Sequence, residues 1–183
     1  MKLFFDTEFT KLSKDAELIS LGIVSEDGDV FYAEFSDYDK SKLDPWIIEN
    51  VIKNLSYSPG DSDINVPEYF YYGSRKFIKA KLLDWLDKFN RVQFVSDVCH
   101  YDFVFLIDLL FGEALKMPPK FSPVCHDINA DIAKYLEISE RDAFNMSRET
   151  ILKNHNIFVS GKKHNALYDA HVIRELYKLT GGK

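Results

Sequence analysis

The stretch Phe4-Phe5-Asp6-Thr7-Glu8-Phe9-Thr10 lies close to the N-terminus and joins an apolar run to two acids. The apolar residues from Leu3 to Phe5 predict a short buried strand. Successive side chains of a strand point to opposite faces, so Asp6 and Glu8 should project from the same face. Neighbouring carboxylates raise each other's pKa unless a cation lies between them, and hard divalent metals bind such oxygen-rich sites. Taken alone, Asp6-Thr7-Glu8 would more often open a polar turn. A metal site therefore requires further acids elsewhere in the chain.

The chain has 183 residues, of which 46% are hydrophobic, and this length predicts a single domain over residues 1–183. No apolar run is long enough to span a bilayer, and Asp6 and Glu8 come too early for a signal peptide. Cys99 and Cys125 lie far apart without a C-x-x-C pattern, which favours reduced thiols and a cytoplasmic protein. A disulfide between them stays open at this point.

The formal net charge of −6 argues against a broad basic surface that grips duplex nucleic acid. It does not argue against a narrow site in which metal ions supply the positive charge. Net charge therefore says little about the ligand.

Hydrophobic periodicity predicts strands over 18–24 and 30–35, joined by the turn Glu26-Asp27-Gly28-Asp29 as an antiparallel meander. Asp44-Pro45 indicates a helix start, with a helix to about Asn54. Further along, the pattern predicts strands over 92–95 and 124–128, and helices over 74–89, 101–114, 130–136, 147–155 and 165–180. An opening meander followed by alternating strands and helices predicts an α/β fold with a mixed β-sheet flanked by helices.

Residues 56–73 contain several glycines, prolines and aspartates, and we expect a long surface loop there. The run Tyr69-Phe70-Tyr71-Tyr72 within it is expected to pack onto the core. A platform on which nucleic-acid bases stack is the less favoured alternative.

A second acid stands on an apolar helix stripe. Counting by three and four places Asp102 on the face set by Phe105, Leu106 and Leu109. The alternative is a first-turn acid that complements the helix dipole at the edge of the core. Asp97, at the end of the preceding predicted strand, is interpreted instead as a strand-end or capping residue.

The last predicted helix carries Asp169 within the stripe of Ala166 and Ala170. An ionised carboxylate on a core-facing stripe is costly unless it is paired or binds a metal. Asn165 is a plausible N-cap, so His164 should lie on the entering loop, where it can reach a metal site. Such a histidine is often an ordinary surface residue.

The lysines Lys162 and Lys163 beside this histidine offer a phosphate-attracting patch as another interpretation. His171 completes an H-x-x-x-x-D-x-H spacing, but this spacing lacks a same-face pair of ligands and argues against zinc.

Three segments together resemble the motifs of the DEDD superfamily of 3′–5′ exonucleases. Phe5-Asp6-Thr7-Glu8-Phe9 is similar to its D-x-E motif, and residues 101–106, Tyr-Asp-Phe-Val-Phe-Leu, resemble the second motif. Residues 164–170, His-Asn-Ala-Leu-Tyr-Asp-Ala, are similar to the H-x-A-x-x-D-A motif of the histidine-bearing (DEDDh) branch. The order and separation of the motifs match over essentially the whole chain. The resemblance implies a ribonuclease H-like mixed sheet.

Within the superfamily the chain most resembles small stand-alone exoribonucleases related to ribonuclease T, because of residues 6–10 and of Ser96-Asp97 ahead of the second motif. It departs from them at Val98, where an asparagine is usual. This departure bears on a contact with substrate or beside the metal ligands, and leaves the metal-binding set intact.

The resemblance implies four metal ligands, Asp6, Glu8, Asp102 and Asp169, and a general base, His164. Two Mg²⁺ or Mn²⁺ ions roughly 3.5–4 Å apart would be held by these carboxylates. The implied reaction is hydrolysis of the 3′-terminal phosphodiester of single-stranded RNA, with release of nucleoside 5′-monophosphates.

In the family the terminal nucleotide docks at the positions of Phe9 and Thr10, and stacking on Phe9 is a hypothesis. The resemblance also implies a nucleic-acid 3′ end as partner, RNA favoured over DNA, no membrane, and a homodimer.

Three other functions stay open at this stage. They are a DNA-directed 3′–5′ exonuclease, a phosphodiesterase acting on a dinucleotide or nucleotide, and a catalytically inactive nucleic-acid-binding module on the same fold. The presence of all five motif residues argues against the inactive module. A site distinguishes RNA by a hydrogen bond to the 2′-hydroxyl, and the sequence does not locate that partner.

Overall fold

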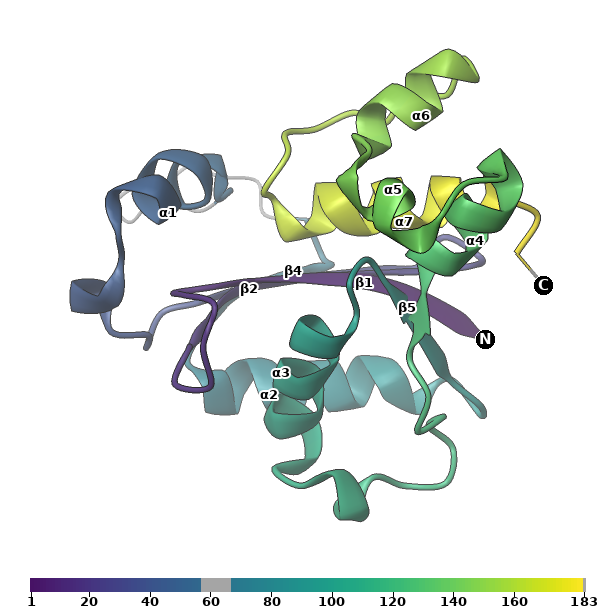
Figure 1. Cartoon of the computed structure of the whole chain (residues 1–183). Coiled ribbons are helices and arrows are strands. Elements are labelled where there is room, and N and C mark those ends of the chain that lie inside the picture. The colour runs from purple at the N-terminus through teal and green to yellow at the C-terminus, as the bar shows by residue number, and fades with distance from the viewer. Residues whose placement is uncertain (57–66, 183) are drawn as a thin grey trace.

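The computed structural model describes residues 1–56 and 67–182, and a mixed six-stranded sheet divides it into two helical layers (Figure 1). The strands are β1 (Lys2–Phe9), β2 (Leu18–Ser25), β3 (Val30–Phe35), β4 (Phe70–Gly73), β5 (Gln93–Ser96) and β6 (His126–Asp127), in the spatial order β4-β3-β2-β1-β5-β6. The first three strands form an antiparallel meander, whereas β4, β5 and β6 add in parallel. The expected fold class is confirmed.

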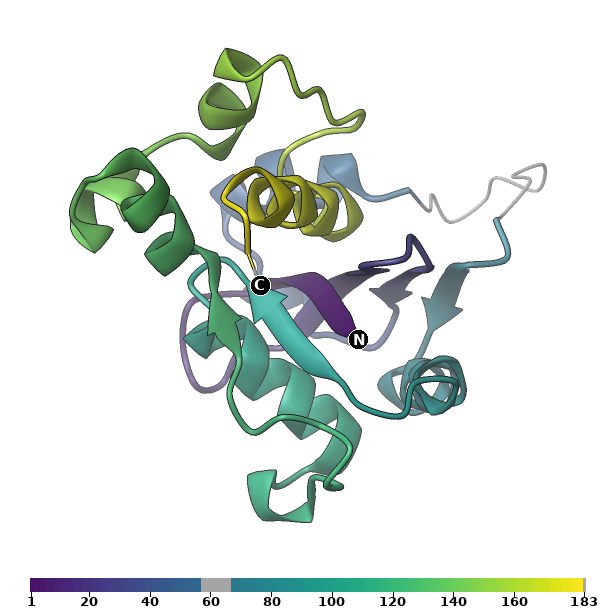
Figure 2. The same ribbon diagram turned by 90° about the vertical axis from the view of Figure 1, so that its right-hand side faces the viewer.

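Helices cover both faces of this sheet. The α-helices are α1 (Pro45–Asn50), α2 (Arg75–Asp87), α3 (His100–Phe111), α4 (Ile128–Leu136), α5 (Glu140–Asn145), α6 (Arg148–Asn154) and α7 (Ala166–Leu179). Short 3₁₀ turns are η1 (Lys40–Lys42), η2 (Ile52–Asn54) and η3 (Ala114–Lys116). Figures 1 and 2 show α2 and α3 on one face and α4 to α7 on the other. Among the described residues, no helix is long and apolar enough to cross a membrane.

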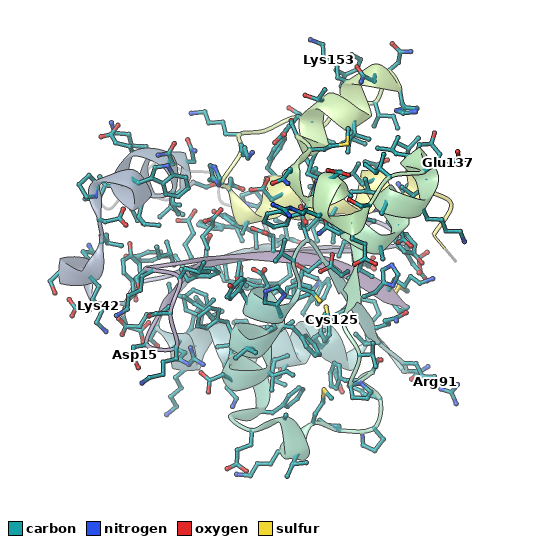
Figure 3. All side chains as sticks on the ribbon, in the orientation of Figure 1. Asp15, Lys42, Arg91, Cys125, Glu137 and Lys153 are labelled. Atoms are coloured by element: carbon teal, nitrogen blue, oxygen red, sulfur yellow. The ribbon has the colours of Figure 1, made fainter. Side chains whose placement is uncertain are left out.

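The side-chain alternation along β1 builds the two cores. Leu3 and Phe5 pack with the α2–α3 layer, and Phe4 packs with residues of α4, α6 and α7. Figure 3 shows side chains filling the space on both sides of the sheet. Asp6 and Glu8 continue the face of Phe4, so both carboxylates face the α7 layer, as the period of two predicts. The strand runs to Phe9, well beyond the short strand expected from the sequence, because β2 pairs with it from Leu3 to Phe9.

Most predicted elements are present with shifted ends. Asp44 caps α1 by accepting from the backbone N–H of Ile47, as expected, but the helix ends at Asn50 and η2 continues it. β6 is only two residues long, because the Asp127 side chain caps α4 and Ile128 already belongs to that helix. The sequence analysis did not predict α5.

The expectation of a continuous loop over 56–73 is wrong at its C-terminal end. Phe70–Gly73 forms β4, which pairs in parallel with β3. The rings of Phe70 and Tyr32 stack with centroids 5.4 Å apart, and those of Tyr71 and Phe31 with centroids 5.0 Å apart. Packing onto the core is thus confirmed for these two aromatic residues. Residues 57–66 of the predicted loop lie outside the described part of the chain.

The two cysteines are free thiols, as expected. Cys99 lies at the start of α3 with its sulfur 3.9 Å from the backbone carbonyl oxygen of Cys125.

α7 crosses β2 at a point where only glycine fits. A Cβ at Gly22 would lie 2.3 Å from the carbonyl oxygen of Ala166, in the first turn of α7. Such a contact with backbone atoms cannot be relieved by a rotamer change, so the helix would have to move away from the sheet. The small residue Ala166, fully buried, meets it from the other side.

We therefore expect Gly22→Ala to destabilise the protein by roughly 2–3 kcal/mol, because overpacking forces backbone shifts. Chemical unfolding measures the change. Ser36→Ala, at an exposed position just after β3, is the control and should stay within about 0.5 kcal/mol of the wild type. A Gly22→Ala protein as stable as this control would show that α7 tolerates displacement.

Candidate active site

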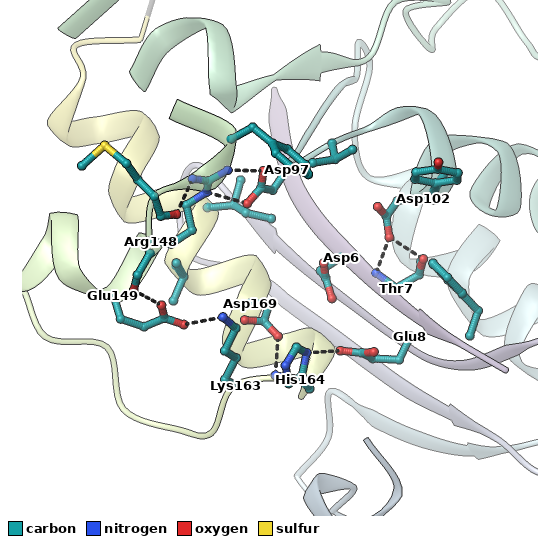
Figure 4. Close-up of a pocket in the computed structure, with 18 residues that line it drawn as sticks. Asp6, Thr7, Glu8, Asp97, Asp102, Arg148, Glu149, Lys163, His164 and Asp169 are labelled. Carbon is teal, nitrogen blue, oxygen red and sulfur yellow. Dashed lines mark hydrogen bonds and ion pairs between the residues drawn. The ribbon is translucent and has the colours of Figure 1, made fainter. Parts of the chain in front are cut away.

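The five residues implied by the motifs line one cavity of about 340 Å³ (Figure 4). Asp6 and Glu8 come from β1, Asp102 from α3 and Asp169 from α7. His164 lies on the segment just before α7. Residues more than 150 positions apart in the chain thus converge where β1 passes between the two helical layers.

Asp102 faces the core and also lies in the first turn of α3. The core-facing position and the first-turn position expected as alternatives are therefore both present. The Asp102 side chain is buried, with only 6% of the residue exposed. Its Oδ1 accepts two hydrogen bonds from Thr7, one from the backbone N–H at 2.9 Å and one from Oγ1 at 2.5 Å. The carboxylate is therefore fixed to β1, beside Asp6.

His164 lies on the entering loop, as predicted, because Asn165 caps α7. The backbone N–H of His164 donates to Asp169 Oδ2 at 2.8 Å, and Nδ1 of its ring lies 3.8 Å from Glu8 Oε1. Glu8, His164 and Asp169 each offer a ligand atom, and these three atoms lie within 4.8 Å of one another. Trp46 of α1 packs edge-on against the imidazole with centroids 5.0 Å apart.

A reciprocal pair of amides holds this loop in place. Asn165 Nδ2 donates to the carbonyl oxygen of Asn54 at 2.9 Å and to the hydroxyl of Tyr32 at 3.0 Å. Asn54 Nδ2 donates in return to the carbonyl oxygen of Lys163 at 2.9 Å. Both neighbours of His164 are thus tied to the η2 segment, and Asn165 is also tied to β3. This matters because His164 itself has a φ of 61°, a conformation uncommon for residues other than glycine.

The crowding of the carboxylates is visible in their pKa values. Burial, followed by the charges of Asp102 and Asp169, holds the pKa of Asp6 well above its usual range. Burial and the charges of Asp169 and Asp102 raise the pKa of Glu8 to about 8. Burial raises the pKa of Asp169 to about 7 and that of Asp102 to about 6. These four carboxyl groups are difficult to ionise side by side. A divalent cation would fit among them, because its charge would stabilise the ionised carboxylates.

Burial lowers the pKa of His164, and the charge of Lys163 lowers it further. The imidazole is therefore neutral near pH 7, the form in which it accepts a proton.

Asp97 follows the last residue of β5, as the strand-end interpretation expects. Its carboxylate is paired with Arg148, whose Nε and one terminal nitrogen donate at 2.7 and 2.9 Å. Arg148 also donates to Asn129 Oδ1 and to two backbone carbonyls. Asp97 thus lines the cavity as half of an ion pair that fastens α6 to the end of β5.

Phe9 and Thr10 differ in their relation to the cavity. Phe9 lines it and packs against Phe105 of α3 with ring centroids 4.9 Å apart. Thr10 is fully buried, and it closes the β1–β2 hairpin through hydrogen bonds from its N–H to Glu17 and from the N–H of Glu17 to its Oγ1. Its side chain lies outside the residues that line the cavity.

Several residues of the cavity wall were not expected from the sequence to lie at the site. They are Tyr101, Phe144, Met146, Ser147, Arg148 and Glu149, mostly from the α5–α6 segment. α5 was not expected, and its six residues are too few for helical periodicity to identify a face. Tyr101 stands in the second motif directly before Asp102, which was the one available signal.

Val98 also lines the cavity, and its φ is 55°. Asparagine and glycine tolerate this left-handed region, whereas it strains a β-branched residue. The asparagine that is usual here in the resembling exoribonucleases fits this backbone better than the valine does.

The chain is similar to known proteins in sequence and in structure. No protein-family model matches the sequence. Two Mycobacterium tuberculosis proteins, one from each of two strains and both named 3′–5′ exoribonuclease, are 31% identical to this chain over 121 residues. The match spans 65% of this chain and 66% of each relative, just under two thirds of the relatives' length.

Solved structures share the architecture at low identity. The nuclease domain of 3′hExo, a DEDDh family member bound to rAMP, has a TM-score of 0.65 at 13% identity and covers 99% of this chain and 92% of that chain. Pop2p of S. pombe, in a form with bound Mg²⁺ and Mn²⁺, has a TM-score of 0.65 at 14% identity, covering 96% and 81%. This chain has the ribonuclease H-like fold. The solved structures establish the fold, and the chemistry of the site is inferred from the residues that line the cavity.

The raised pKa values predict how pH acts on the metal-free protein. A carboxyl whose pKa is raised on folding stabilises the fold below its unfolded value, and this contribution is lost as pH rises through the folded value. For Glu8 that window runs from 4.5 to about 8. We therefore expect the unfolding midpoint of the metal-free protein to fall across this range.

Mn²⁺ should oppose this loss more strongly at about pH 8 than at about pH 6, because a metal ion requires deprotonated ligands. Thermal unfolding with and without Mn²⁺ at both pH values tests this, with Glu8→Gln expected to flatten the metal-free pH profile. Equal stabilisation at the two pH values would contradict the assignment.

Proposed function

We propose that this protein is a metal-dependent 3′–5′ exoribonuclease of the DEDDh, ribonuclease T-like type. The observation that carries the proposal is the convergence of four carboxylates and one neutral histidine in a single cavity. The 31% identity to two proteins named 3′–5′ exoribonuclease supports the substrate class.

Asp6, Glu8, Asp102 and Asp169 would hold two divalent ions, Mg²⁺ or Mn²⁺. Such ions lower the pKa of a bound water and stabilise the negative charge that develops on the departing 3′ oxygen. The oxygen donors of the cavity suit hard cations, and burial together with neighbouring carboxylates raises the pKa values of Asp6 and Glu8. Arg148 is committed to Asp97, and Lys163 lies 3.9 Å from Glu149.

His164 would remove the proton from the attacking water. Its partly exposed ring stands beside Glu8, and its loop is anchored on both sides by Asn54 and Asn165. The backbone N–H that it donates to Asp169 couples the position of the base to that of a metal ligand. A fixed base beside the attacking water contributes typically 10²- to 10⁴-fold to the rate.

The aromatic side chains of the cavity suit the bases of a single strand. Phe9 is half-buried against Phe105, and the exposed side chains of Tyr101 and Phe144 also line the cavity. Stacking of bases on such rings is tolerant of sequence. The net charge of −6 argues against a broad basic surface for a duplex and favours a single-stranded 3′ end.

Single-stranded RNA carrying a 5′ label should shorten stepwise from its 3′ end in Mg²⁺ or Mn²⁺. EDTA and the Asp102→Asn variant should each abolish shortening, because both remove the metal ions or a ligand to them. DNA of the same sequence, run in parallel, separates the exoribonuclease from a DNA-directed 3′–5′ exonuclease. Absence of shortening on either strand would favour a catalytically inactive nucleic-acid-binding module.

His164→Ala should lower turnover at least about 100-fold while Mn²⁺ binding stays close to that of the wild type. The retained affinity is the informative result, because Nδ1 of this histidine is close enough to Glu8 and Asp169 to act as a ligand. Calorimetric Mn²⁺ titration beside a turnover assay decides the matter. A large loss of Mn²⁺ affinity would make His164 a ligand, and unchanged turnover would exclude it as the base.

The homodimer and the cytoplasmic location belong to the same proposal. The free thiols of Cys99 and Cys125 support a reducing compartment. The homodimer rests on the resemblance to small exoribonucleases, and size-exclusion chromatography with light scattering tests it.

A further inference from the structure

Thr7, the middle residue of the Asp-Thr-Glu motif, is neither a proposed metal ligand nor the proposed base. Its side chain projects from the face of β1 opposite to Asp6 and Glu8, and only 4% of the residue is exposed. A buried threonine on the α3 side of a strand is normally part of the packing. Here its hydroxyl and its backbone N–H both donate to the same carboxylate oxygen, Oδ1 of Asp102.

The end of a neighbouring strand makes this contact available. β5 pairs with β1 from Lys2 to Phe4, so within the described residues the edge of β1 that faces β5 has no strand partner further along. The backbone N–H of Thr7 points to this free edge. Asp102 occupies the position that a strand carbonyl would otherwise take, and it satisfies a donor that would be costly to bury unpaired.

Asp102 is also the one metal-ligand candidate that arrives from the α2–α3 layer. Asp6, Glu8 and Asp169 lie on the α7 side of β1, as the alternation along β1 and the position of α7 require. For a cation to be shared across the strand, the Asp102 carboxylate must be turned toward Asp6. Figure 4 shows it held by Thr7 at the edge of the cavity.

We propose that the Thr7 hydroxyl is a positioning group for metal binding. Together with the backbone N–H it occupies Oδ1 of Asp102, and it would thereby fix the rotamer in which Oδ2 could bind a cation along with Asp6. A charge-assisted hydrogen bond of 2.5 Å from a side chain whose own χ1 is restricted by β-branching is suited to this task. The inference rests on the proposed metal-dependent function.

Two substitutions separate the hydroxyl from the shape of the side chain. Thr7→Val keeps the volume and the branching but removes the donor, whereas Thr7→Ser keeps the donor and removes a methyl group. Ser25→Ala is the matched control, because Ser25 is a fully buried β2 residue whose hydroxyl bonds Asp29. It pairs with Leu3, at the end of β1 remote from the cavity.

The experiment measures Mn²⁺ binding by calorimetry and by the Mn²⁺-dependent shift in unfolding temperature, without any substrate. We expect Thr7→Val to bind Mn²⁺ about tenfold more weakly than the wild type, and Thr7→Ser to bind within about twofold of it. Ser25→Ala should lose stability but bind Mn²⁺ like the wild type. In turnover assays, raising Mn²⁺ should restore most of the activity of Thr7→Val.

Each alternative result decides something different. Equal Mn²⁺ affinity in wild type and Thr7→Val, with only a lower unfolding temperature, would overturn the inference and leave the proposed function intact. Absence of Mn²⁺ binding in the wild type would overturn the proposed function itself. If Thr7→Val does not fold, Thr7→Ala takes its place against Thr7→Ser, and equal affinities in that pair would likewise overturn the inference.

Discussion

The crowding of four carboxylates in one cavity is the constraint on which the rest of this structure depends. Burial raises the pKa values of Asp6, Glu8, Asp102 and Asp169, and the charges of Asp102 and Asp169 raise those of Asp6 and Glu8 further. The metal-free protein therefore loses stability as these carboxyls ionise. A protein keeps such an arrangement only when strong packing elsewhere offsets it, or when a cation does. The two apolar cores on either side of β1 supply the packing, and the proposed metal ions would supply the charge.

The packing acts on the site through close contacts of small residues. α7 lies against β2 because Gly22 has no side chain and Ala166 has a short one. That contact sets the height of α7 above the sheet and therefore the distance from Asp169 to the two acids of β1. Asp102 reaches the same place by a different route, since the short pairing of β5 leaves an edge of β1 open. The site thus depends on the absence of a Cβ at Gly22 and on the short pairing of β5 with β1, as well as on the side chains that line the cavity.

Two strained residues stand at the cavity, and hydrogen bonds or ion pairs flank both of them. Val98 and His164 have positive φ values of 55° and 61°. His164 is bracketed by the amide pair Asn54–Asn165, and Val98 follows Asp97, which Arg148 holds. Strain of this kind persists when the surroundings over-determine the backbone, and it often occurs where a side chain must be aimed at a substrate.

The sequence by itself predicted the alternation of β1, most of the strands and helices in their order, and the caps Asp44 and Asn165. Through the resemblance it also indicated the five motif residues that line the cavity. These are local properties, since a period of two, a capping residue or a short motif can be read without knowing what packs against it. Only the tertiary structure decided the rest. β4 and α5 were missed because each is too short for periodicity to identify, and the pairing of Arg148 with Asp97 joins residues 51 positions apart. Thr7 shows the difference most clearly, because its position between two acids is local, whereas its bond to Asp102 arises from where β5 stops.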